Sequence, residues 1–151
     1  MPHAFITLVV AVLSFCAIIA APAFAVGTDA GSAAAEADYT EAKATVDAEN
    51  FVAALPMLVM LTQDDPQNAN AWNLLGFTHR KLGDMDAAAQ AYSVALGINP
   101  EHLGALEYQG ELFIQTGKLD LAKANLARLK GLCGNCEEFG DLEKALTAAG
   151  A

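Results

Sequence analysis

The feature that most constrains the fold of this chain is a residue pattern that returns every 34 positions. Residues that begin turns, end helices or allow close packing share this interval: Pro66 and Pro100, Gly76 and Gly110, Gly83 and Gly117, and Ala88 and Ala122. Between them the sequence is rich in Ala, Leu, Glu and Lys, which favour helix, and poor in strand signals. A fixed interval of this length indicates a helical unit that repeats and stacks on itself.

The repeated pattern resembles the tetratricopeptide repeat over residues 35–136. The middle unit carries the most signature positions: Trp72, Leu75, Gly76, Ala88, Tyr92, Ala95 and Pro100. The third unit keeps fewer and has Leu106 in place of Trp, and the first is the weakest match. The resemblance implies an all-α, right-handed solenoid of three helix pairs, with repeats at about residues 35–68, 69–102 and 103–136.

Residue size and backbone freedom agree with this pattern. Gly76 and Gly110 are small where the paired helices of one unit must approach closely. Gly83 and Gly117 are placed to end first helices, because glycine readily adopts the positive φ of a helix C-cap. The apolar side chains of Leu82, Leu96 and Ile98 are expected in the core.

The segment after the third unit is predicted to be a capping helix at residues 137–149. Its apolar residues fall on one helical face: Phe139, Leu142, Ala145 and Leu146. A solenoid needs such a helix to cover the apolar surface of its last unit.

The first residues predict export. An apolar run without charged side chains from Ala4 to Ala21 is followed by Ala-Phe-Ala at residues 23–25, the pattern that signal peptidase cleaves. We therefore expect a signal peptide at residues 1–25, a flexible linker at 26–36, and a periplasmic or otherwise exported domain at 37–149. The alternative is that the apolar run stays uncleaved and anchors the protein in the membrane.

The charge of the chain argues against nucleic acid as a partner. The formal net charge is −10, and no basic stripe interrupts it. Without such a stripe the protein cannot gain affinity by releasing counterions from phosphates.

The family resemblance implies a concave groove lined by first helices. Four positions of each unit are expected to face it: Glu36, Tyr39, Lys43 and Val46; Asn70, Asn73, Phe77 and Arg80; and Gly104, Glu107, Glu111 and Ile114. Glu107 and Glu111 stand where relatives that bind a terminal carboxylate need positive charge, which disfavours that ligand. The mixed surface favours an unidentified peptide or helix bearing charges of both signs, with Tyr39 and Phe77 as apolar anchors. The alternative is that these are ordinary solvated helix faces.

Catalytic motifs are scarce in the sequence. Neither His79 nor His102 has a Ser, Asp or Glu at a spacing typical of a nucleophile and its base, and glycine-rich phosphate loops are missing. We therefore predict a non-enzymatic adaptor without a cofactor.

Cys133 and Cys136 form a Cys-x-x-Cys pair at the end of the third unit. A redox role would require the strand–helix context of a thioredoxin-like fold, and a metal site would require further ligands, for which His102 and a carboxylate are candidates. A structural disulfide suits an oxidising compartment. The sequence around the pair, LCGNCEE, resembles the last unit of small exported bacterial repeat proteins. The prediction is a disulfide that closes the third unit, with thiol-redox or metal-dependent activity as the alternative.

Overall fold

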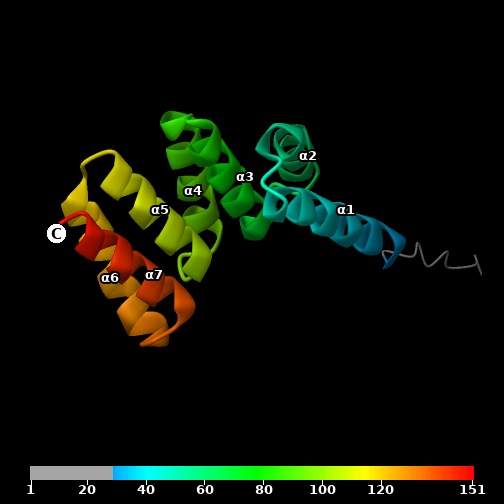
Figure 1. The fold of residues 1–151 in the computed structure, drawn as a ribbon. Coiled ribbons are helices and arrows are strands. Elements are labelled where there is room, and N and C mark those ends of the chain that lie inside the picture. The colour runs from blue at the N-terminus through cyan, green and yellow to red at the C-terminus, as the bar shows by residue number, and fades with distance from the viewer. Residues whose placement is uncertain (1–28) are drawn as a thin grey trace, which may run out of the picture.

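The computed structural model describes residues 29–151, which form seven helices (Figure 1). They are α1 (Asp29–Asp47), α2 (Phe51–Asp64), α3 (Ala69–Leu82), α4 (Met85–Ile98), α5 (Leu103–Gln115), α6 (Leu119–Cys133) and α7 (Glu137–Ala148). The predicted signal peptide, residues 1–25, and positions 26–28 of the predicted linker lie outside the described residues.

The helices pack as consecutive antiparallel pairs that stack into a solenoid. The pairs are α1 with α2, α3 with α4, and α5 with α6, while α7 packs on both α5 and α6. Residues 29–151 contain helices and no strand, so the predicted all-α fold of three helix pairs with a terminal capping helix is confirmed. Within the same residues, no helix has both the length and the apolar character needed to cross a membrane.

Polar side chains fix where four of the helices begin. The N-cap residues of α2, α3, α4 and α5 each accept a hydrogen bond from a backbone N–H in the first turn; they are Asn50, Asn68, Asp84 and His102. Each bond satisfies a donor that the helix itself leaves unpaired. The indole of Trp72 donates to the carbonyl of Pro66 at 3.0 Å, which ties the signature tryptophan to the turn before its own helix.

Two glycines of the second unit have the predicted roles: one ends its first helix, and the other allows its two helices to approach closely. Gly83 ends α3 in the left-handed region with φ of 90°. Gly76 lies so close to α4 that a Cβ atom there would be 2.7 Å from the ring of Tyr92, a side chain that is fully buried. Glycine is therefore what allows α3 and α4 to approach.

Gly110, one repeat later, differs from the prediction. A Cβ atom at Gly110 would lie 2.6 Å from Cδ2 of Leu142, which belongs to α7 and not to the paired helix α6. Helices α5 and α6 share an apolar cluster that includes Leu106 and Leu129, and Asn125 Nδ2 adds hydrogen bonds to the carbonyl of Leu106 at 3.0 Å and to Gln109 Oε1 at 3.1 Å. In the third unit the small residue accommodates the capping helix.

Two further expectations are wrong. Helix α1 begins at Asp29, so residues 29–36 are helical where a flexible linker was predicted. This stretch is rich in alanine, the strongest helix former, and its small side chains do not prevent helix formation. Leu82 is 41% exposed, because it lies in the last turn of α3, at the edge of the contact with α4. Leu96, by contrast, packs against a buried cluster as expected.

Candidate functional site

The concave side of the solenoid contains a hollow of about 450 Å³, called the groove below. Helices α1, α3 and α5 line it, as predicted, and α7 closes one end. Eight of the twelve residues expected to face it line it: Tyr39, Lys43, Val46, Asn70, Asn73, Phe77, Gly104 and Glu107. The structure brings them together, and their part in binding stays a prediction.

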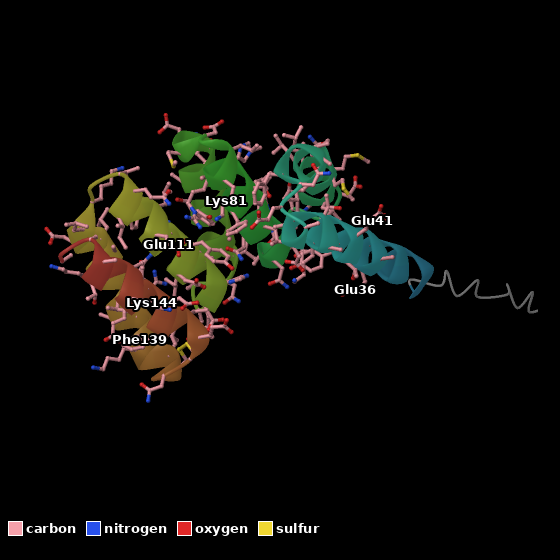
Figure 2. All side chains as sticks on the ribbon, in the orientation of Figure 1. Glu36, Glu41, Lys81, Glu111, Phe139 and Lys144 are labelled. Atoms are coloured by element: carbon pink, nitrogen blue, oxygen red, sulfur yellow. A yellow bond between two sulfur atoms is a disulfide. The ribbon has the colours of Figure 1, made fainter. Side chains whose placement is uncertain are left out.

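Three other predicted residues lie at a second, smaller hollow of about 300 Å³. They are Arg80, Glu111 and Ile114. Glu36 lies on α1, at the opposite end of the molecule from Phe139 and Lys144 (Figure 2), and lines neither hollow.

An ion pair stands between the two hollows. Arg80 is only 6% exposed, and its guanidinium lies 2.5 Å from the carboxylate of Glu111 on α5. Its planar head also lies over the rings of Phe77 and Tyr108, at 5.4 and 5.8 Å from their centroids. Arg80 therefore fixes α3 to α5. Its position in the repeat had suggested a charge available to a ligand, but the ion pair with Glu111 already uses it.

A row of three aromatic rings crosses the groove. The ring of Phe77 packs 6.0 Å from Phe51 on α2 and 4.8 Å from Tyr108 on α5. The repeat register predicts Phe77 at the groove but not its two neighbours, because neither occupies a position that usually faces the groove. Phe51 is the first residue of α2, and Tyr108 directly follows a predicted groove residue, which was the only available signal.

His102 acts as a structural link at the groove wall. Its Nδ1 accepts the N–H of Ala105, so Nε2 carries the proton and donates to Oδ1 of Asn70 at 3.0 Å. Burial lowers the pKa of His102, which keeps this neutral form at neutral pH. Both ring nitrogens are thus occupied in joining the second repeat to the third.

Carboxylates dominate the charged lining of the groove. Two lysines, Lys43 and Lys81, face six acidic side chains: Asp47, Glu49, Glu107, Glu137, Glu138 and Asp141. The three from α7 could not be predicted from the repeat, because α7 lies beyond it.

Glu107 is the most deeply placed of these acids, with 8% of its surface exposed. Burial is the main cause that raises its pKa to about 8. Repulsion from nearby carboxylates adds to this; they are Glu111, Asp141 and Glu138. A buried carboxyl group surrounded by like charges holds its proton at neutral pH.

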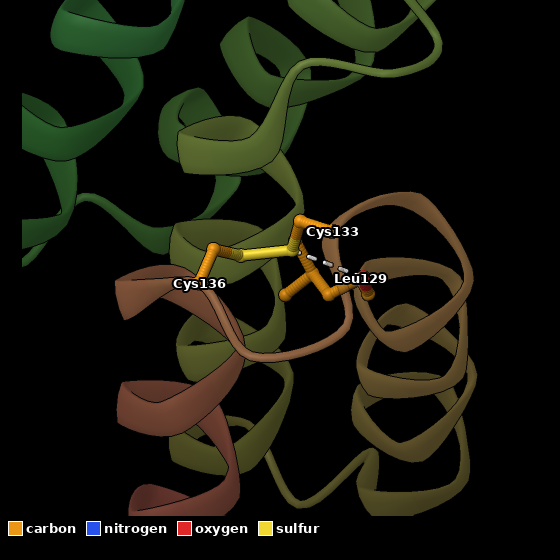
Figure 3. Close-up of a disulfide and its surroundings, with 3 residues drawn as sticks. All are labelled: Leu129, Cys133 and Cys136. Atoms are coloured by element: carbon orange, nitrogen blue, oxygen red, sulfur yellow. Dashed lines mark hydrogen bonds between the residues drawn. A yellow bond between two sulfur atoms is a disulfide. The ribbon is translucent and has the colours of Figure 1, made fainter.

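Cys133, the last residue of α6, and Cys136, just before α7, are joined by a disulfide bond in the structure (Figure 3). Gly134 between them ends α6 with φ of 72°. In the described part of the chain, no three His, Cys, Asp or Glu side chains are grouped to hold a metal ion. His102, the candidate third ligand, uses both ring nitrogens elsewhere.

We expect Cys133→Ser to loosen α7 while leaving α6 intact. Sγ of Cys133 lies 3.1 Å from the carbonyl oxygen of Leu129 (Figure 3), and a serine hydroxyl can donate to that oxygen, so the substitution removes only the covalent link. Closing so short a loop contributes about 2 kcal/mol in the chain-entropy model. Amide hydrogen exchange should become faster after residue 137, as it should in the reduced wild type. An exchange pattern unchanged by the substitution, together with a lost activity, would favour the redox alternative.

Comparison with known proteins identifies one repeat and the fold. Residues 69–102 match the tetratricopeptide repeat family. No curated protein matches the chain. The Yersinia enterocolitica type III secretion chaperone SycD, solved with a peptide of the translocator YopD, is 21% identical with a TM-score of 0.68 over 80% of this chain and 92% of that one.

Two further structures have similar folds. The first tetratricopeptide-repeat domain of Spaghetti (RPAP3), bound to an HSP90 peptide, is 19% identical with a TM-score of 0.68 over 78% of this chain and 94% of that one. The first such domain of human RPAP3 is 18% identical with a TM-score of 0.66 over 77% of this chain and 94% of that one.

Proposed function

Since residues 69–102 are a tetratricopeptide repeat and the chain has the fold of proteins built from such repeats, we propose that this protein is a non-enzymatic adaptor that binds a peptide or helical segment of a partner in its groove. The observation that carries the proposal is the groove itself. It combines an aromatic row with polar side chains in a hollow lined by residues of five helices: α1, α2, α3, α5 and α7. Peptide complexes of SycD and Spaghetti, which share the fold, support it.

The groove has the composition expected of a peptide site. Tyr39 and Phe77 offer large apolar faces, and Asn73 offers an amide oxygen that can pair with a peptide. Aromatic anchors commonly contribute most of the binding energy of such a surface, while the surrounding polar groups set orientation.

Truncating the two anchors tests the proposal. We expect the double variant Tyr39→Ala/Phe77→Leu to bind peptides selected on the wild type at least tenfold more weakly, since each lost aromatic contact is worth on the order of 1–2 kcal/mol. The leucine retains part of the packing against Phe51 and Tyr108. Fluorescence anisotropy with labelled peptides measures the change, and circular dichroism checks the fold.

A matched control removes apolar side chains from another surface. Val52 and Met60 are exposed on α2 and line no part of the groove, so Val52→Ala/Met60→Ala should bind as the wild type does. If this control loses binding while the groove variant keeps it, the groove proposal fails.

We further propose that the protein works in an exported compartment, with membrane contact only through residues 1–25 if these remain attached. The apolar run and the Ala-Phe-Ala site support cleavage, and a disulfide between Cys133 and Cys136 is stable under oxidising conditions. Sequencing the N-terminus of the protein from its native host should find Val26. An intact residue 1 on a membrane-bound protein would replace export with anchoring.

A further inference from the structure

The end of the groove between α5 and α7 collects carboxylates that have little positive charge against them. Glu107 and Glu138 take part in none of the ion pairs formed by the described side chains. Asp141 has only the highly exposed Lys144, at 3.9 Å. This end of the groove therefore gathers acidic side chains that the protein itself pairs weakly or not at all.

A buried amide acceptor points to the same place. Asn73 is 7% exposed and lines the groove, and its Oδ1 is buried without a hydrogen-bond donor among the described residues. Gly104 lies directly beside this amide, since a Cβ atom at Gly104 would be 3.3 Å from Asn73 Nδ2. A buried acceptor without a donor costs stability, so a ligand that supplies a donor to Asn73 Oδ1 would remove this cost.

The neighbouring turn of α5 shows how this protein satisfies such a carboxylate. Glu111, four residues after Glu107, is paired with the guanidinium of Arg80, which stacks on two aromatic rings. Glu107 points into the groove from the same helix and has no arginine of its own. The chain thus supplies a cation, Arg80, to Glu111 but supplies none to Glu107.

We propose that Glu107, Asn73, Glu138 and Asp141 form a subsite for an arginine side chain of the peptide that the groove binds. This rests on the proposed function and adds the chemistry of the ligand. A planar guanidinium offers five donors, enough to reach the Glu107 carboxylate and Asn73 Oδ1 together, and its charge balances the two acids of α7. A metal ion fits poorly, since no three ligating side chains of the described residues are grouped to hold one.

The protonation of Glu107 agrees with this assignment. Its pKa of about 8 arises from burial and from like charges: Glu111 on the same helix, and Asp141 and Glu138 on α7, with only the Arg80 side chain of α3 opposing them. The phenol of Tyr108, beside it on α5, also has a raised pKa. An arriving cation favours the ionised carboxylate, so Glu107 releases its proton, and arginine binding should strengthen as pH rises from 6 to 9.

Selection of displayed random peptides on the purified protein tests the subsite. We call a selected peptide groove-dependent if it binds the Tyr39→Ala/Phe77→Leu variant more weakly than it binds the wild type. We expect arginine to be enriched among them, and replacement of that arginine by uncharged, isosteric citrulline to weaken binding tenfold or more. In Glu107→Gln/Asp141→Asn the difference between arginine and citrulline should disappear.

A matched variant removes two carboxylates from another part of the groove. Asp47→Asn/Glu49→Gln makes the same change in charge on α1 and in the turn after it, and should retain the preference for arginine. Groove-dependent peptides without arginine, or a preference that survives in Glu107→Gln/Asp141→Asn, overturn the subsite and leave the proposed function standing. A selection that returns no groove-dependent peptide overturns both.

Discussion

Replacing Gly76 with alanine should destabilise the protein by roughly 1–3 kcal/mol, even though alanine is the better helix former. The added Cβ would lie 2.7 Å from Cδ1 and Cε1 of Tyr92. That ring is rigid and fully buried between α3 and α4, so the helices must separate to admit the new atom. Urea unfolding followed by circular dichroism measures the loss.

Gly97 provides the matched control. It lies in α4, where a Cβ atom would meet nothing within 4 Å, so Gly97→Ala should stabilise the protein by up to about 1 kcal/mol. Opposite signs for the same chemical change would separate packing from helix propensity. If both substitutions stabilise the protein, the close approach of α3 to Tyr92 is wrong.

The repeat interval predicted most of the fold because it reports contacts that recur in every unit. Gly83 and Gly117 recur at this spacing because both turns between paired helices need a residue with positive φ, and the turn prolines recur between units. Side chains on the groove faces of α1, α3 and α5 could be placed by the same register. The repeat register therefore predicted most of the residues of α1, α3 and α5 that line the groove.

What the repeat could not predict lies where the third unit meets α7. Gly110 keeps the signature residue but receives Leu142 in place of a side chain from α6. Glu138 and Asp141 reach the groove from a helix that has no counterpart in the repeat. Burial and charge pairing also depend on neighbours across helices, which is why Arg80 could be placed but not recognised as a buried partner of Glu111.

The Arg80 ion pair lies between the groove, which Phe77 and Tyr108 line, and the smaller hollow that Ile114 lines. Lys81 lines both hollows, and Figure 2 shows it on α3 near Glu111 of α5.

The capping helix should be the part of the fold most sensitive to a single truncation. We expect Leu142→Ala to cost roughly 2–5 kcal/mol, because the side chain is fully buried in a cluster with residues of α5 and α6. Units of a solenoid contact only their neighbours, so the loss should be local. Amides of α7 should exchange much faster, while those of α3 and α4 keep their protection.

Leu132→Ala is the comparison, since Leu132 of α6 is 40% exposed and outside the buried clusters, so its truncation should cost much less stability. Equal loss of protection in all helices of Leu142→Ala would show that α7 is no separable cap. Since α7 supplies Glu138 and Asp141 to the groove, the variant should also lose its preference for arginine over citrulline before it loses groove binding through Phe77. A variant whose α7 is unprotected yet still prefers arginine would place the positively charged part of the ligand elsewhere.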